Sequence, residues 1–257
     1  MIHRQVVPAI GCTEPIAVAL CVARARELLG GEPESIRIRL SANILKNAMG
    51  VGIPGTGMTG LPIAVALGAL IGRSELGLEV LRDCNREAVE RGKRFIAGGR
   101  ISIGLEDNAP DKLYIAVTVS AGGHEAEARI ATEHTNFVYL RRDGDVIEDK
   151  PIHAGHADNE EEVPLTLRKV YEFATETDVA DLRFILEARD MNEAAAADGL
   201  RENFGHRLGK TLCSPLGRGI MGEGIFSKVL AATSCACDAR MAGAMIPVMS
   251  NSGSGNQ

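Results

Sequence analysis

The sequence predicts an α+β fold: a helical body packed through small residues, with an antiparallel β-sheet subdomain attached to it. Three observations favour this class. A helical run, Pro15–Leu29, is followed by a short alternating strand, strand-like segments cluster between residues 100 and 141, and apolar helical segments resume after residue 165. Ala, Gly and Val are abundant while aromatic residues make up 4% of the chain, which favours close helix packing and glycine loops.

The first predicted part covers residues 1–97. Pro15–Leu29 repeats apolar residues at helical spacing, and Gly30-Gly31 ends this predicted helix. Ser35–Ser41 alternates between apolar and polar residues, which predicts a strand with one solvent-exposed face. A stretch rich in Gly, Asn and Pro follows up to Gly60. We then expect a buried helix over Leu61–Gly72 and an amphipathic helix over Glu75–Ala97, closed by Gly98-Gly99.

The second predicted part, residues 98–160, is the sheet subdomain. Gly122-Gly123 and Asp143-Gly144 are typical hairpin turns. The strands expected around them are Arg100–Glu106, Lys112–Ser120, His124–Thr132 and Asn136–Arg141. The acidic stretch His153–Glu162 is expected to be an exposed loop.

The third predicted part, residues 161–257, returns to helices. They are expected near Leu165–Thr175 and Ala180–Asp198, followed by an apolar, small-residue segment over Ser227–Met249. A loop of Ser, Asn and Gly occupies residues 250–257. Because an apolar segment typical of a core precedes this loop, we expect the chain to be truncated at its C-terminal end.

Composition excludes several classes of partner. The formal net charge is −6 and no Lys/Arg cluster stands out, so nucleic acid is not expected to bind. No apolar run is long enough to span a membrane and no signal peptide begins the chain, which indicates a cytoplasmic protein. The six cysteines contain no CxxC pair, so reduced thiols are expected rather than disulfides or a zinc site.

Cys12 stands immediately before a predicted helix start, in the phrase Gly11-Cys12-Thr13-Glu14-Pro15. The positive end of a helix dipole lowers the pKa of a thiol and favours the thiolate that metals and iron–sulfur clusters require. The alternative is a small buried apolar residue.

The phrase Ser41–Asn47 runs into the glycine-rich loop and offers polar side chains together with free backbone N–H groups. Asn43, Lys46 and Asn47 are therefore candidates for holding a carboxylate or a phosphate. The Gly-Lys-Ser/Thr ending of a phosphate-binding P-loop is missing. A structural turn between strand and helix is the competing interpretation.

Two further phrases carry candidate chemistry. His134 lies beside Thr135 and Asn136 and could act as a general base or contact a substrate, or could be an ordinary core-edge histidine. Arg240, in Asp238-Ala239-Arg240-Met241, suits a carboxylate clamp or a structural Asp/Arg pair.

Together these phrases resemble the L-cysteine desulfidase family, which is related to the alpha chain of iron–sulfur L-serine dehydratases. The stretches that carry the resemblance span nearly the whole chain: GCTEPIAVAL, SANILKNAMGVGIPGTGMTGLPIAVALGAL, GLEVLRD, the HTN triplet, PLT, RFILEA and DARMAGAMIPVMSNSGSGNQ.

The resemblance implies a [4Fe-4S] cluster held by three cysteines with one open iron position, and no pyridoxal phosphate. Cys12 matches the first cluster ligand. The other two ligands are expected beyond Gln257, so this chain alone is not expected to hold a cluster. Cys21, Cys84, Cys213, Cys235 and Cys237 match no ligand position.

The implied reaction is β-elimination of L-cysteine to pyruvate, ammonia and sulfide. His134 is the candidate base, and the candidates for holding the substrate are Asn43, Lys46, Asn47, Arg240, Ser252, Ser254 and Asn256. An L-serine dehydratase of the same cluster type is the nearest alternative, and a non-catalytic scaffold or partner subunit is an alternative of another class. We expect a homo-oligomer or a complementing C-terminal chain as partner.

Overall fold

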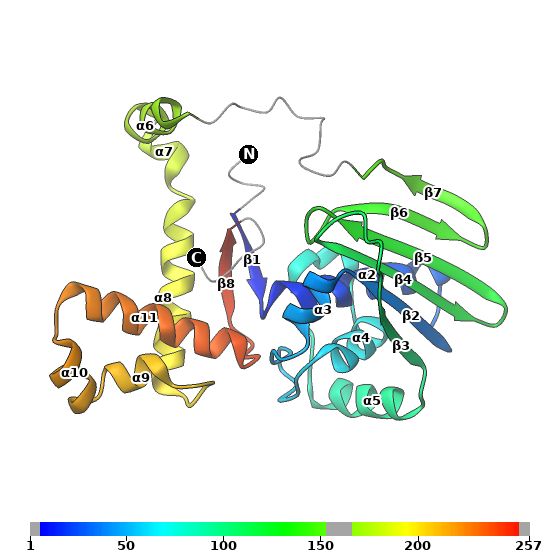
Figure 1. The fold of residues 1–257 in the computed structure, drawn as a ribbon, viewed down its shortest axis with the longest axis horizontal. Helices are drawn as coiled ribbons and strands as arrows, with labels where there is room; N and C mark the ends of the chain where they lie inside the picture. The colour runs from blue at the N-terminus through cyan, green and yellow to red at the C-terminus, as the bar shows by residue number, and fades with distance from the viewer. Residues whose placement is uncertain (1–5, 153–165, 252–257) are drawn as a thin grey trace.

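The computed structural model describes residues 6–152 and 166–251. It has a sheet-and-helix body and a separate helical lobe, with strands β1 and β8 between them (Figure 1). Helices and strands are both abundant and the larger sheet is mostly antiparallel, so the predicted α+β class is confirmed.

The body is built on a six-stranded sheet in the order β3-β2-β4-β5-β6-β7. Its strands are β2 (Ser35–Leu40), β3 (Ile101–Leu105), β4 (Tyr114–Ala121), β5 (His124–Ala131), β6 (Phe137–Arg142) and β7 (Asp145–Asp149). All neighbouring pairs are antiparallel except β2 and β3, which run parallel. A parallel pair needs a long crossover, and the helices between residues 42 and 97 supply it.

The early strand Ser35–Leu40 therefore lies inside the sheet, between the edge strand β3 and β4. Its alternating pattern buries Ile36, Ile38 and Leu40 and exposes the residues between them, as the sequence predicts. The proposed boundaries of the three parts stay a prediction.

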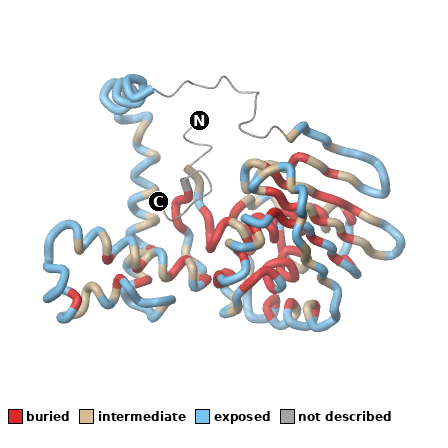
Figure 2. Tube along the Cα trace, viewed as in Figure 1, coloured by how far each residue is buried: buried red, intermediate tan, exposed pale blue. Residues whose placement is uncertain are grey.

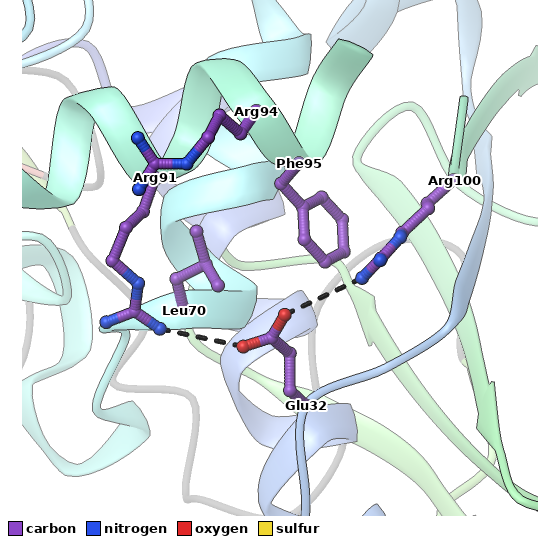
Figure 3. Close-up of a pocket in the computed structure, with 6 residues that line it drawn as sticks. All are labelled: Glu32, Leu70, Arg91, Arg94, Phe95 and Arg100. Atoms are coloured by element: carbon purple, nitrogen blue, oxygen red, sulfur yellow. Dashed lines mark ion pairs between the residues drawn. The ribbon is translucent and has the colours of Figure 1, made fainter. Parts of the chain in front are cut away.

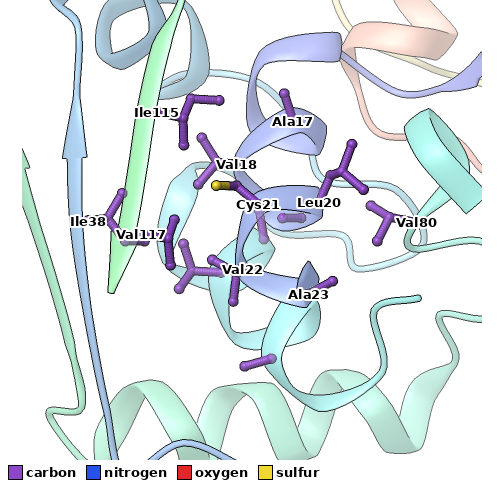
Figure 4. Close-up of a cluster of buried hydrophobic side chains, with 14 of the residues drawn as sticks. Ala17, Val18, Leu20, Cys21, Val22, Ala23, Ile38, Val80, Ile115 and Val117 are labelled. Carbon is purple, nitrogen blue, oxygen red and sulfur yellow. The ribbon is translucent and has the colours of Figure 1, made fainter. Parts of the chain in front are cut away.

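Helix α2 (Thr13–Leu29) is the centre of the core. It packs against β4 and β5 on one side and against α4 (Leu61–Leu70) on the other. Figure 4 shows Val18 and Val22 of α2 directed towards Ile115 and Val117 of β4. Most of α2 is buried because it has packing partners on both sides, which is why small apolar residues occupy nearly its whole circumference.

Close contact between α2 and α4 depends on Gly68. A Cβ built at Gly68 would stand 2.6 Å from the carbonyl oxygen of Ala19, a backbone atom that cannot rotate away. Helix α5 (Arg86–Ala97) covers the other side of α4 and is clearly amphipathic.

The prediction of one continuous helix over Glu75–Ala97 is wrong for the first half of that range. A 3₁₀ helix, η1 (Ser74–Glu79), and turns occupy that stretch, and Gly77 has φ 53°, outside the helical region. The regular helix begins only after Asn85, whose side chain accepts a hydrogen bond from the backbone N–H of Ala88 and caps it.

The helical lobe follows the sheet in the chain. It contains α6 (Leu167–Glu176), α7 (Val179–Leu182), α8 (Ile185–Arg201), α9 (Leu208–Leu212), α10 (Pro215–Met221) and α11 (Ile225–Met241). Helix α8 packs on α11, and α11 on α9. Figure 2 shows burial concentrated in the body, whereas much of the lobe is exposed.

The lobe ends in β8 (Pro247–Asn251), which pairs antiparallel with β1 (Val6–Ile10) at the beginning of the described chain. These two strands, together with α3 (Ala42–Ala48), β7, α9 and α10, are elements that the sequence patterns do not predict. Each is at most seven residues long and too short for a clear period.

The predicted acidic loop His153–Glu162 lies outside the described residues. No helix among residues 6–152 and 166–251 is long and apolar enough to cross a membrane.

Replacing Gly68 by Ala should lower the free energy of unfolding by about 1–3 kcal/mol, because the added Cβ overpacks the α2–α4 contact. Gly219→Ala in α10 is the matched control, since nothing lies within 4 Å of its ideal Cβ position. It should be neutral or stabilising, because Ala is the better helix former. Urea unfolding followed by far-UV circular dichroism measures both, and equal midpoints for the two variants would contradict the packing argument.

Candidate functional site

The candidate site forms where α2 begins. The side chain of Glu14, in the first turn of α2, accepts hydrogen bonds from Cys12 Sγ at 2.9 Å, from Thr13 Oγ1 at 3.2 Å and from Asn47 Nδ2 at 3.2 Å. Asn47 belongs to α3, so two phrases that are far apart in the sequence meet at one carboxylate. Glu14 itself is absent from the predicted site residues.

Gly11 sets the direction in which the chain enters α2. Its φ is +78°, a conformation natural for glycine, and a Cβ there would stand 2.4 Å from Pro54 Cγ in the glycine-rich loop. The residue before Cys12 is therefore in close contact with the loop, which brings the second predicted phrase against the first.

The glycine-rich loop in turn docks on the C-terminal end of α11. The backbone N–H of Gly52 donates to Met241 O at 2.9 Å, and that of Gly55 donates to Gly243 O at 3.1 Å. A Cβ at Gly52 would stand 2.3 Å from the backbone of Ala242. The two backbones can approach this closely only because Gly52 has no side chain.

This docking places Arg240 inside the site. Arg240 is 3% exposed, and its Nε donates to the carbonyl oxygen of Gly11 at 2.9 Å. Burial lowers the pKa of Arg240, while the acidic groups of Cys12 and Glu14 oppose that shift. The guanidinium keeps its charge in proteins, so the site contains a buried cation facing the Glu14 carboxylate.

His134 reaches the same cluster from the turn between β5 and β6. The side chain of Asn136 braces this turn by donating to Ala131 O at 3.1 Å and to Thr132 Oγ1 at 3.1 Å. Burial lowers the pKa of His134, the charge of Arg240 lowers it further, and Glu14 opposes both. The ring is therefore neutral at pH 7.

Nε2 of His134 is buried and has no hydrogen-bond partner among the described residues. A buried polar atom without a partner is rare and costs stability, which indicates that something outside the described residues, such as a ligand, completes this contact.

The electrostatics of Cys12 differ from the sequence prediction. Burial, followed by the charge of Glu14 and the hydrogen bond to it, raises the pKa of the Cys12 thiol to about 12. The prediction of a thiolate favoured by the helix dipole is therefore wrong for this structure. The hydrogen-bonded contacts, including the one from Cys12, bring the pKa of Glu14 below its ordinary value, although burial alone would raise it.

The remaining predicted residues are placed differently. Asn43 and Lys46 are exposed on α3, while Asn47 on the same helix turns inward to Glu14. Ser252, Ser254 and Asn256 lie outside the described residues. Glu14 could have been singled out from the sequence, since a carboxylate two residues after a cysteine at a helix start can reach back to the thiol.

The described residues do not fit a complete iron–sulfur site. Within them, no group of three or more His, Cys, Asp or Glu side chains is arranged to hold a metal. All six cysteines are free thiols, as expected, and Cys12 is the cysteine of the candidate site. Cys235 and Cys237 lie on one helix, with Cys235 buried and Cys237 exposed, so they do not face a common ligand.

A separate surface pocket of about 200 Å³ is lined by Glu32, Leu70, Arg91, Arg94, Phe95 and Arg100 (Figure 3). Glu32 pairs there with Arg91 at 3.5 Å and with Arg100 at 3.6 Å. These pairs are solvent-exposed, and none of the predicted site residues lines the pocket.

Because the thiolate is the reactive form, Cys12 should react with iodoacetamide at pH 8 about 10³-fold more slowly than free cysteine, given a pKa near 12 in place of 9.0. Glu14→Gln should speed the reaction, since it removes the nearby negative charge. Glu133→Gln, a change at an exposed carboxylate, serves as the control. Peptide mass spectrometry over time measures the rates, and reaction of Cys12 at the rate of free cysteine would show that a thiolate is present after all.

Comparison with known proteins identifies the family of the chain. The profile of the family described as "Serine dehydratase alpha chain" matches residues 75–257. No solved structure matches the chain with significance.

Curated relatives match along the whole chain. UPF0597 proteins are 59% identical in Bacteroides thetaiotaomicron, 52% in Parabacteroides distasonis and 45% in Oleidesulfovibrio alaskensis, in each case over 100% of this chain. The chain spans 60% of the length of each of these relatives. Since the family profile covers well over half of the chain, the chain belongs to the serine dehydratase alpha chain family.

Proposed function

We propose that the chain takes part in β-elimination from a small amino acid, with L-cysteine as substrate. Membership of the serine dehydratase alpha chain family supports a lyase. The observation that carries the proposal is the unpartnered Nε2 of His134, buried beside an anion, Glu14, and a cation, Arg240. A neutral imidazole next to a buried guanidinium is suited to taking a proton from a carboxylate-bearing substrate.

In the proposed reaction His134 removes the α-proton of L-cysteine. The electron pair of the Cα–H bond forms the Cα–Cβ double bond, and the pair of the Cβ–S bond leaves with sulfur as hydrosulfide. The aminoacrylate product tautomerises to an imine, which takes up water and gives pyruvate and ammonia. Atoms balance with one water consumed, and no external oxidant or reductant is required.

Substrate binding is assigned to cationic and amide groups around this histidine. Arg240 supplies the positive charge for the substrate carboxylate. Asn47 is in contact with the cluster through Glu14, whereas Asn43 and Lys46 are exposed on the same helix and belong to the proposed set by the sequence pattern alone. Ser252, Ser254 and Asn256, outside the described residues, complete the proposed set that holds the carboxylate and the amine.

Cys12 is proposed as the one [4Fe-4S] ligand that this chain contributes. A cluster needs further thiolates, which the described residues do not bring to Cys12, so no step of the reaction is assigned to the cluster. Binding also requires the Cys12 thiol to lose the proton that it donates to Glu14. Pyridoxal phosphate has no part in the proposal.

L-serine dehydration is the second candidate, because the family description names serine and the groups around His134 do not separate a thiol from a hydroxyl. The non-catalytic alternative is a scaffold or partner subunit that lacks activity by itself. In either case we propose a cytoplasmic protein that acts as a homo-oligomer or with a complementing chain, without nucleic acid or membrane partners.

The test is an anaerobic assay of this chain and of the full-length Bacteroides thetaiotaomicron relative, both treated with iron and sulfide. Cluster absorbance and the release of pyruvate and sulfide are measured with L-cysteine and with L-serine. We expect the relative to bind a cluster and to release sulfide from L-cysteine. Preference for serine would favour the dehydratase, and neither cluster nor turnover in the relative would overturn the lyase proposal.

Where turnover is measured, replacing His134 by Ala should lower kcat by roughly 10²–10⁴, the usual contribution of a general base. His124→Ala is the matched control, because His124 is exposed on the β4–β5 hairpin and pairs with Asp143. A loss of less than about tenfold would remove His134 from the role of base.

The pH dependence provides a second check on His134. Its folded pKa is lowered, so the neutral base persists below the ordinary value of 6.5 and is lost only as the pH falls through the folded pKa. The acid limb of kcat/KM should therefore lie below pH 6.5, and an acid limb above that value would contradict the assignment.

A further inference from the structure

The hairpin of α10 and the first turns of α11 stands at the outer end of the helical lobe (Figure 1) and is coloured mostly as exposed in Figure 2. Many of its exposed side chains are apolar. This hairpin patch consists of Leu216, Ile220, Met221, Ile225, Phe226 and Val229. The most exposed of them are Ile225 at 82%, Ile220 at 72% and Leu216 at 71%. A single exposed leucine is ordinary, but many large exposed apolar side chains within two successive helices are typical of an interaction surface.

The apolar residues of the patch recur at helical spacing on both helices. Leu216 and Ile220 are four residues apart on α10, and Ile225 and Val229 are four residues apart on α11, so each helix presents an apolar stripe. Polar groups flank the stripes: Arg218 pairs with Glu223 at 3.4 Å, and Lys228 is exposed. An apolar centre with a charged rim is the usual composition of a protein–protein interface.

Glycines in the same hairpin give an independent indication. Glycine is required at position 217 by contacts within this chain, because a Cβ there would stand 2.3 Å from the carbonyl oxygen of Thr211. Gly219, inside α10, differs, since nothing lies within 4 Å of its ideal Cβ position and its φ is not positive. A glycine inside a helix is destabilising without such a reason, and the close approach of another backbone would provide one.

We propose that the hairpin patch is the docking surface for the polypeptide that the longer curated relatives carry in addition to the part matched by this chain, and that it receives an apolar helical face of that polypeptide. The relatives match this chain over its whole length, yet the match accounts for 60% of theirs. They therefore contain, on the same chain, residues able to cover the patch. The proposal is independent of the proposed reaction.

The test compares hydrogen exchange in this chain and in the full-length Bacteroides thetaiotaomicron relative. Peptides that cover α10 and the first turns of α11 should exchange at least about tenfold more slowly in the relative than in this chain. Peptides of β7 serve as the reference, because Val146 and Ile147 expose apolar side chains elsewhere on the molecule. Equal exchange of the hairpin peptides in both proteins would overturn the proposal.

Sedimentation of this chain at several concentrations separates the proposed occupant from a second copy of the chain. Phe226→Ser is compared with Val146→Ser, both at exposed positions where folding should be unaffected. We expect neither substitution to change the sedimentation coefficient of this chain. A dimer that Phe226→Ser weakens and Val146→Ser leaves intact would show that the patch binds a second copy, and would overturn the proposal.

Discussion

The hydrogen bond from Arg240 Nε to the carbonyl oxygen of Gly11 is the contact on which the candidate site depends, because it joins residues separated by 229 positions. Burying a guanidinium is costly unless its charge and its donors are compensated. The compensation comes from the start of α2, where a backbone carbonyl and the Glu14 carboxylate are available. The helical lobe and the sheet body thereby share one charged cluster.

Close backbone contact makes that cluster possible. Gly52 allows the glycine-rich loop to lie directly on the end of α11, and Gly11 allows the chain to turn beside Pro54. Within the cluster, Glu14 combines two roles that oppose each other. It accepts a hydrogen bond from the Cys12 thiol and, together with burial, raises the pKa of that thiol, so that Cys12 stays protonated. The same carboxylate also balances the charge of Arg240. A ligand that interacts with Arg240 or His134 must therefore alter the environment of Cys12 as well.

Local patterns in the sequence predict the core of this fold, and long-range contacts account for what they miss. The alternation at Ile36, Ile38 and Leu40 and the turn at Gly122-Gly123 act over a few residues, so the strands they define could be predicted. The position of β2 between β3 and β4 depends on pairing with strands more than sixty residues later, which no local period encodes. The phrases around Cys12, Asn47, His134 and Arg240 could be recognised as candidates, but their convergence on Glu14 follows from tertiary packing, as does the protonated state of Cys12.

The pairing of β1 with β8 has a consequence for the order in which the protein is made. Val6 pairs with Asn251, so the first described strand has to wait until residues 247–251 have left the ribosome before it finds its partner. The sheet and α2 can form earlier from segments that are complete by residue 149. Arg240 also arrives late, so a nascent chain stalled in the lobe would carry a formed core and an unassembled site. Closure of the site thus waits for a segment that is made long after the core, and the loop that must close joins residues 229 positions apart.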